Sequence, residues 1–335
     1  MPSIAETTEV WNREIEPPAA RFQTLVEHAG RSIELQEAGK IKAGSYLLAD
    51  LTDLSFPYKK PDPNMRSWER SNGRKKIVIQ PGMVPGPGGG IEYVYPYGIV
   101  PRLFLIWLTT EIKLSKSRRV EVGKSVNALR AQLGISSGGK QHANFTRQLE
   151  ALFSAHIVVF EQGPKKEGVT ANKGKVLQIA DSWEIWKSSE TGEVVESIPS
   201  TLEVSESFYN HVQNTAVPLV SEIVSAFKRD PMRLDIYCWL VHRLYMQRAP
   251  ESNVSWSQLS KQFGGNYARE RSFKKAFVDH LQVVLLYYPE ARVSVTRNGL
   301  ILRRSKLHIP PRGAVARILS VEEVVSAAAA IGKAS

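Results

Sequence analysis

The sequence predicts an α+β protein in which one helix–helix–turn–helix–hairpin unit occurs twice. Each copy begins with an apolar helix that carries a tryptophan, Trp107 in the first copy and Trp239 in the second. A short helix follows and ends in glycine, 27 residues after the tryptophan at Gly134 and 25 residues after it at Gly264. This is the element order of a winged helix, so we expect two tandem winged-helix domains with an N-terminal helical and basic extension. Two unrelated α+β units are the alternative.

The first copy is predicted to begin with a helix from Pro101 to about Leu114, because proline suits the first helical turn, where its missing N–H would be unpaired anyway. A short helix over 125–134 leads through a glycine-rich turn to a second helix over about 140–153. Residues 156–162 and 175–186 are rich in β-forming side chains and are predicted to form the hairpin, or wing.

The second copy repeats this order, with predicted helices over about 231–247, 257–264 and 268–284. A hairpin over 291–305 follows, and Asn298-Gly299 at its centre signals a two-residue turn. The glycine after each short helix fits a left-handed helix C-cap before the turn. The helix after the turn is then the recognition helix, which enters the DNA groove in this fold.

Three further segments surround these two domains, which we place at residues 93–200 and 201–312. Residues 1–56 are predicted as an N-terminal extension with one helix from about 19 to 38. Residues 57–92 are basic and rich in proline and glycine, which predicts a linker or an extended arm. Residues 313–335 are predicted to form an amphipathic tail helix.

The composition points to a polyanionic partner. The chain carries 44 Lys and Arg residues against 33 Asp and Glu residues, a net charge of +11. Nucleic acid is the partner that we favour, and an acidic membrane surface or a gain in solubility alone is the alternative. The sequence shows no signal peptide and no run of about 18 apolar residues, so we expect a cytoplasmic protein with no membrane partner. The single cysteine, Cys238, is expected to be a buried thiol.

The motifs of common metal and catalytic sites give little support to an enzyme. No two histidines are separated by one residue, and neither C-x-x-C nor H-E-x-x-H occurs. Gly134 to Lys140 fits the start of a P-loop, but Gln141 stands where magnesium coordination requires Ser or Thr, and the glycines follow a helix rather than a strand. We therefore expect no catalytic residue, no cofactor and no metal. A nucleotide-dependent enzyme that uses the 134–140 loop is the less favoured alternative.

The first recognition helix is predicted to turn Phe145, Leu149 and Leu152 toward the core. Its opposite face would then carry amide, imidazole and guanidinium groups, which suit base edges in the major groove. A solvated polar face is the alternative. The predicted DNA contacts here are Lys140, Gln141, His142, Asn144, Arg147 and Gln148, with Lys116, Arg118 and Arg119 before the helix as phosphate contacts.

The second recognition helix carries the stronger signal, with five basic residues and one acidic residue between positions 261 and 275. A solvated face normally mixes the two signs, so this imbalance favours DNA binding. The second wing adds arginines that suit phosphate or minor-groove contacts. The predicted contacts are Tyr267, Arg269, Arg271, Lys274 and Lys275 on or before the helix, and Arg297, Arg303 and Arg304 on the wing.

Four stretches, at 97–111, 225–240, 263–277 and 288–293, resemble the family of plasmid-encoded RepA replication proteins. This resemblance implies a protein that binds repeated double-stranded sites at its plasmid's origin, helps to open the adjacent AT-rich duplex and recruits host replication initiator or helicase proteins. It also implies that monomers bind the origin and that a homodimer represses its own gene. A plasmid replication initiator is therefore the predicted function, and a winged-helix transcriptional repressor is the alternative.

Overall fold

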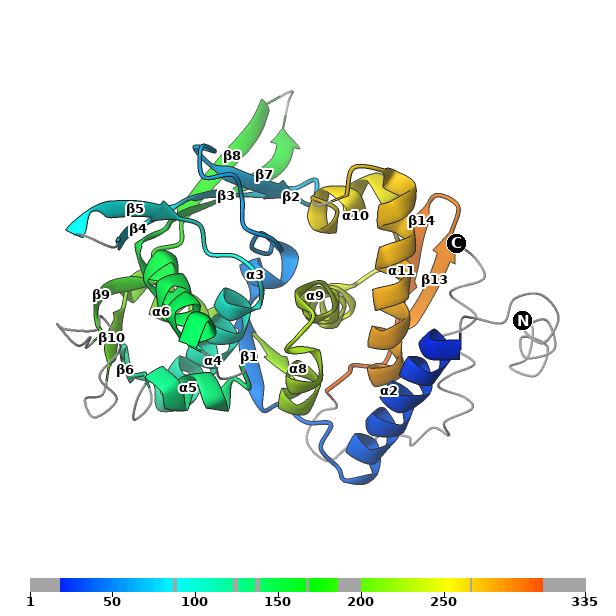
Figure 1. Cartoon of the computed structure of the whole chain (residues 1–335). Coiled ribbons are helices and arrows are strands. Elements are labelled where there is room, and N and C mark those ends of the chain that lie inside the picture. The colour runs from blue at the N-terminus through cyan, green and yellow to red at the C-terminus, as the bar shows by residue number, and fades with distance from the viewer. Residues whose placement is uncertain are drawn as a thin grey trace, which may run out of the picture. The chain divides into compact units, whose positions relative to one another are not determined.

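The structure is a computed structural model that describes residues 19–86, 89–122, 126–135, 139–166, 169–185, 200–265 and 267–309. The predicted tail helix over 313–335 lies outside these residues. The chain divides into two compact units, shown in Figure 1. The first unit contains residues 45–218 and 225–231, and the second contains the residues before 45, residues 219–224 and the residues from 232 onward. The domain bounds expected from the sequence, 93–200 and 201–312, stay a prediction.

The second unit contains a complete winged helix. Its elements in chain order are α9 (Pro231–Met246), β12 (Glu251–Ser255), α10 (Trp256–Phe263), α11 (Glu270–Tyr287), β13 (Arg292–Thr296) and β14 (Gly299–Arg303). β14 lies between β12 and β13 and is antiparallel to both. The three predicted helices and the hairpin are therefore present, and the structure adds β12, which the sequence did not predict.

The tight turn of this hairpin differs from the prediction by one residue. Thr296 pairs with Gly299, so the two turn residues are Arg297 and Asn298 rather than Asn298 and Gly299. Gly299 instead begins β14 with φ near 150° and lies so close to β12 that any Cβ would overlap the carbonyl oxygen of Val254. The glycine is required for the close approach of two strands, because it has no side chain to displace its neighbour.

Aromatic side chains fill the core of the second unit. The ring of Phe263 on α10 lies 5.7 Å from that of Trp239 on α9 and 5.3 Å from that of Phe277 on α11. Phe273, one turn before Phe277, has no exposed surface and contacts it at 5.6 Å. Each such aromatic pair stabilises a core by about 0.5–1.5 kcal/mol beyond its buried area. The apolar spacing read from the sequence thus fixes which face of α11 turns inward.

The N-terminal helix α2 (Ala19–Glu37) packs along α11 in the second unit (Figure 1). The hydroxyl of Ser32 donates a hydrogen bond of 2.6 Å to the carbonyl of Leu286, and Nδ1 of His28 lies 3.0 Å from the hydroxyl of Tyr287. These contacts join residues more than 250 positions apart in the chain. The predicted helix near 19–38 is confirmed, and it belongs to the core of this unit.

The first unit contains a second winged helix with the same strand order. Its elements are α4 (Ile99–Ser115), β6 (Arg119–Glu121), α5 (Val126–Gln132), α6 (Gly139–Ser154), β9 (Ala180–Glu184) and β10 (Thr201–Val204). β10 lies between β6 and β9, as β14 lies between β12 and β13. The matching helices and the matching sheet order confirm the predicted α+β fold with two tandem winged-helix units.

The wing of the first unit is not where the sequence placed it. The predicted second strand over 175–186 is interrupted at Leu177 and Ile179, which are both 2% exposed. Its first part belongs to β8 (Val169–Val176), which pairs with β7 (His156–Lys166), and only its second part forms the wing strand β9. The β7–β8 hairpin is thus an insertion between the recognition helix and the wing.

The inserted hairpin completes a four-stranded sheet with residues that were predicted to be a linker or arm. β2 (Trp68–Ser71) pairs with β3 (Lys75–Gln80), and β3 pairs with β7. Ile77 and Ile79 of β3 are fully buried, while the lysines and Gln80 around them are half-buried or exposed. This alternation is that of a half-buried strand, which the basic composition of the segment concealed.

A two-stranded ribbon, β4 (Gly82–Pro85) with β5 (Ile91–Val94), packs on α6. Val84, Val94 and Ala151 form the apolar contact between them. The hydroxyl of Ser154 donates a hydrogen bond of 3.0 Å to the carbonyl of Met83. A Cβ at Gly82 would overlap the carbonyl oxygen of Ala151, so the backbones approach closely here. The ribbon therefore covers part of the recognition helix of the first unit.

A buried arginine fixes the chain that leads into these strands. Arg102 on α4 is 5% exposed and donates hydrogen bonds to the carbonyls of Phe56 at 2.6 Å, Pro57 at 3.3 Å and Gly98 at 2.5 Å. Its guanidinium carbon lies 4.8 Å from the centre of the Tyr58 ring. Carbonyl oxygens and an aromatic face are the partners that a buried cation needs.

A half-buried group of charges joins three further elements of the first unit: α3 (Ala49–Asp53), β3 and α7 (Glu206–Thr215). Lys75 lies 2.9 Å from Asp50 and 3.2 Å from Asp53, and Nε2 of His211 lies 2.9 Å from Asp50. Burial alone would raise the pKa of Asp50, but hydrogen bonds from His211 and Lys75 hold it well below its usual range. The remaining elements are β1 (Ser45–Leu48), β11 (Ala216–Leu219) and α8 (Ser221–Phe227), and β1 pairs with β11.

We expect His308 to make the second unit sensitive to acid. Burial lowers the pKa of this histidine from 6.5 to about 3, and neither ring nitrogen has a hydrogen-bond partner among the described residues. The unfolded chain therefore binds the extra proton first, so stability falls as the pH drops from 6.5 toward 3, by about 1.4 kcal/mol for each pH unit. Denaturant unfolding followed across this range should show the loss.

The variant His308→Phe should flatten this pH dependence, because it removes the titrating group and keeps a ring against Tyr288, whose centroid lies 4.3 Å from that of His308. His156→Gln, at an exposed histidine, is the control and should behave as the parent chain does. An unchanged pH profile in His308→Phe would contradict the assignment.

Candidate nucleic-acid interface

The first turns of α11 present cations to solvent on the face opposite the core. Phe273 and Phe277 are fully buried, whereas Arg269, Arg271 and Lys275 are exposed. Arg269 occupies the N-cap position with an extended backbone, so its side chain leaves the helix at its end. Guanidinium groups on such turns can read guanine in a major groove or bind phosphate.

Two other predicted contacts of this helix are engaged within the unit. The ammonium of Lys274 lies 2.8 Å from Glu270 and 5.5 Å from the centre of the Trp256 ring. The Tyr267 hydroxyl donates to the sulfur of Met232 at 3.8 Å, and its ring meets Phe273 edge to face. Both side chains are half-buried. They are better placed to hold the start of the helix than to reach toward a partner.

The wing of the second unit adds an exposed row of basic residues. Arg303 is oriented by its own sheet, since it donates to the hydroxyl of Ser294 at 2.7 Å and lies 3.4 Å from Glu251. Arg297 at the turn and Arg304 after β14 are exposed. Sequence reasoning missed Arg292, which is exposed and pairs with Arg303 across the hairpin. The strand alternation of residues 292–296 was the signal that could have found it.

The recognition helix of the first unit is more covered than its sequence suggests. Gln148, predicted on the outer face, is only 1% exposed: its side-chain oxygen accepts from the N–H of Tyr97 at 2.7 Å and its amide donates to the carbonyl of Tyr95 at 3.4 Å. Arg147 is half-buried and forms an ion pair with Glu92 of β5. Asn144 is exposed. The side chains of Lys140, Gln141 and His142 lie outside the described residues.

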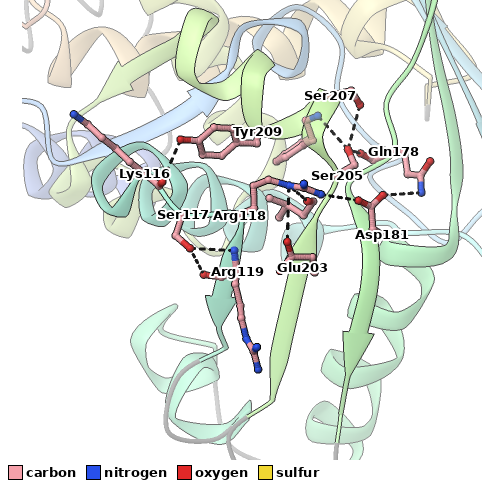
Figure 2. A network of polar contacts seen from close by, with 12 residues as sticks. Lys116, Ser117, Arg118, Arg119, Gln178, Asp181, Glu203, Ser205, Ser207 and Tyr209 are labelled. Atoms are coloured by element: carbon pink, nitrogen blue, oxygen red, sulfur yellow. Dashed lines mark hydrogen bonds and ion pairs between the residues drawn. The ribbon is translucent and has the colours of Figure 1, made fainter.

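The three predicted phosphate contacts before α5 have different roles (Figure 2). Arg118 points into the wing, where it lies 2.8 Å from Asp181 and 3.8 Å from Glu203 and donates to the carbonyl of Val204 at 3.1 Å. The Arg119 side chain points away from this network, and it is exposed. Lys116 is also exposed, and its left-handed backbone, with φ of 55°, ends α4. The contacts of Arg118 thus lie within the wing, whereas Lys116 and Arg119 are exposed.

The glycine-rich loop follows a helix, α5, rather than the strand that precedes a P-loop. Gly134 ends α5 with a positive φ of 65°, and residues 136–138 lie outside the described residues. The sequence from Gly134 to Gly138 also fits G-x-S-x-G, but that motif turns from a strand into a helix, whereas this segment follows a helix. Within the described residues, no group of three or more His, Cys, Asp or Glu side chains is placed to hold a metal ion. No described helix is long and apolar enough to cross a bilayer.

Comparison with known proteins gives one family match. The family model described as "Plasmid encoded RepA protein" matches residues 95–281, which is more than half of the chain. No curated protein sequence matches.

Two crystal structures of domains 2 and 3 of RctB are similar to this chain. One, of selenomethionine derivatives, has a TM-score of 0.47 and 10% identity and covers 76% of this chain and 96% of its own. The other has a TM-score of 0.46 and 11% identity and covers 83% and 99%. With TM-scores below 0.5, these matches add nothing to the fold assignment, which the two equivalent sheets establish.

Substitutions of the neighbouring residues Arg118 and Arg119 should differ in their effect on the free energy of unfolding, although each removes one positive charge. Arg118→Ala should lower the free energy of unfolding by about 1 kcal/mol, since it removes partly exposed ion pairs and a hydrogen bond to the wing backbone. Arg119→Ala removes the same charge from an exposed position and should change it by less than about 0.5 kcal/mol. Denaturant unfolding of the two variants measures the difference. Equal losses would show that Arg118 does not anchor the wing.

Proposed function

The chain belongs to the family of plasmid-encoded RepA proteins, and from this membership and its basic surfaces we propose that it initiates plasmid replication. In this proposal it acts as a binding protein rather than a catalyst. It binds repeated double-stranded sites at the plasmid origin, promotes opening of the adjacent duplex and recruits host replication proteins. Self-association into a homodimer would give a second form that does not initiate.

The exposed cations of the second unit carry the proposal. Arg271 and Lys275 lie on the first turns of α11 and Arg269 is its N-cap residue, and the wing adds Arg292, Arg297, Arg303 and Arg304. A polar helix face beside a basic hairpin is the arrangement with which winged helices bind a major groove and the adjacent backbone. Glu270 and Glu251 lie at this surface, and each has a basic partner, Lys274 and Arg303 respectively. The surface therefore has a net excess of unpaired positive charge, which suits phosphate.

The first unit supports the same function with fewer free groups. Lys116 and Arg119 are exposed and suit phosphate, and Asn144 on α6 suits an adenine edge. We propose Lys140, Gln141 and His142 as further contacts from the start of α6, on the sequence pattern alone. Tyr267, Lys274 and Arg118 enter the proposal as residues that hold the contact surface in place.

Footprinting on the origin of the plasmid that carries this gene tests the proposal. We expect protection of repeated sites and, next to them, thymines that become reactive to permanganate as the duplex opens. Protection without permanganate reactivity would mean a repressor rather than an initiator. The absence of any protected repeat would overturn origin binding.

A double substitution tests the α11 surface. Arg271→Ala with Lys275→Ala should weaken binding to origin DNA at least about tenfold and reduce the slope of log K against log salt by about 2, because two cationic contacts are lost. Both residues are exposed, so circular dichroism should show an intact fold.

The matched control is Arg31→Ala with Lys40→Ala, which removes two exposed positive charges at and beyond α2. Ser32 of this helix contacts Leu286 near the end of α11, far from the first turns of that helix. The control should keep most of the affinity. If both pairs lose affinity equally, the α11 surface acts through net charge alone and is not the binding site.

A further inference from the structure

A hollow lies beside the recognition helix of the first unit. It has a volume of about 380 Å³ and is lined by residues of α6, of β5 and of the loop over 57–66, which we call the basic loop. Figure 1 shows β5 beside α6. Asn144 of α6 and Lys60 of the basic loop both line this hollow. The contacts proposed above use Asn144 and leave Lys60 without a role.

Hydrogen bonds fix both ends of the basic loop. At its start, the carbonyl of Pro57 accepts from the N–H of Gly98 at 2.9 Å and from the buried guanidinium of Arg102 at 3.3 Å. At its end, the hydroxyl of Tyr95 donates to the carbonyl of Met65 at 2.8 Å. Lys60 therefore extends from backbone that is already ordered, so a partner that binds it has less conformational entropy to remove.

The walls of the hollow are held in place as well. On α6, the buried amide of Gln148 accepts from the N–H of Tyr97 and donates to the carbonyl of Tyr95, which holds the chain after β5 against the helix. In the basic loop, Pro61 and Pro63 both line the hollow, and a proline ring fixes its own φ. The hollow is therefore preformed, and a ligand need not order its walls.

Lys60 gives the hollow its net positive charge. Glu92 of β5 and Arg147 of α6 also line the hollow, but they neutralise each other as an ion pair. Lys60 is exposed and has no ion-pair partner among the described residues. The one acidic residue of the basic loop, Asp62, uses its carboxylate to accept a hydrogen bond of 2.8 Å from the N–H of Asn64. An anionic group is therefore the ligand that this hollow favours.

The position of the hollow beside α6 indicates which anion it meets. A helix with its side chains is about 10–12 Å across, and the major groove is about 12 Å wide. A recognition helix therefore fills the groove, and the structure beside the helix meets one of the two phosphate backbones that border it. These backbones form ridges on either side of the groove. A helix with a hollow at its side has the shape that such a ridge fits.

We propose that this hollow receives the sugar–phosphate backbone beside the groove that α6 occupies, and that Lys60 binds one of its phosphates. An ammonium suits this role because it meets a phosphate as a point charge. Asn144 then reaches a base edge while Lys60 fixes the position of α6 on the duplex, so Lys60 is a positioning residue. The inference rests on the proposed function for the binding of duplex DNA by α6, but not on origin opening or on the sequence of the site.

The test measures the duplex affinity of the full chain by fluorescence anisotropy at several salt concentrations. Two duplexes of equal length are compared, one with the origin repeats and one with their sequence scrambled. Lys60→Ala should weaken binding to both by the same factor, about fivefold, and reduce the slope of log K against log salt by about 1, because one phosphate contact is lost. Lys60→Arg keeps the charge and should keep both the affinity and the slope.

The matched control is Lys59→Ala. Lys59 is the neighbouring residue and is also exposed, but it is not among the residues that line the hollow. This control removes the same charge from the same loop and should retain most of the affinity and the salt slope. Equal losses in the two variants would show that the basic loop acts through net charge and would overturn the assignment of Lys60.

The scrambled duplex separates this inference from the proposed function. A phosphate contact is independent of base sequence, so the effect of Lys60→Ala should be visible on the scrambled duplex even if the parent chain does not prefer the origin repeats. That lack of preference would count against the proposed function alone. A loss confined to the origin duplex would make Lys60 a base contact, and an unchanged salt slope would show that it meets no phosphate. Either result overturns the inference, and a parent chain that binds neither duplex would overturn both.

Discussion

The guanidinium of Arg102 sets the path of the chain through the first unit. A buried cation is stable only where its donors are satisfied, and here the carbonyls of Phe56, Pro57 and Gly98 accept them. The segment that follows Pro57 must therefore pass beside the start of α4. It stays there through a second cation, Arg70, whose guanidinium carbon lies 5.0 Å from the centre of the Tyr58 ring and 4.8 Å from that of Trp68. β2, the first strand of the four-stranded sheet, begins in this segment. The position of the sheet beside the winged helix therefore depends on the hydrogen bonds of the buried Arg102 guanidinium.

The sequence predicted the second unit well because the decisive contacts there are local. Apolar side chains at helical spacing identify the buried face of α11, and a short turn joins β13 to β14. In the first unit the decisive partners are distant. Ile77 and Ile79 read as part of a basic, proline-rich stretch, and only their pairing with Val159 and Ile157 makes β3 a central strand. The sequence around β3 contains no local pattern that predicts β7 as its pairing partner.

The exposure of individual site residues also depends on contacts that the sequence does not show. Arg118 and Arg119 are identical in type, but successive residues of an extended segment point to opposite sides, so one enters the wing and the other faces solvent. Gln148 looks like an exposed polar residue in the sequence, yet the backbone around Tyr95 and Tyr97 satisfies its amide. Both outcomes depend on tertiary neighbours. The two recognition helices consequently differ in their charged groups, although their units share one topology. The exposed cations of α11 have no ion-pair partner among the described residues, whereas Arg147 of α6 is paired with Glu92 and would have to leave it to bind another group.

The packing of α2 on α11 has a consequence for synthesis. Ser32 and its partner Leu286 are 254 residues apart, so α2 leaves the ribosome long before its partner exists. At about 5–20 residues per second this delay is roughly 10–50 s. Throughout it, the apolar side chains of Leu25, Ala29 and Leu35, all buried in the finished protein, have no native surface to cover them. The first described helix is thus among the last to dock, and until then the nascent chain exposes apolar side chains that favour aggregation or chaperone binding.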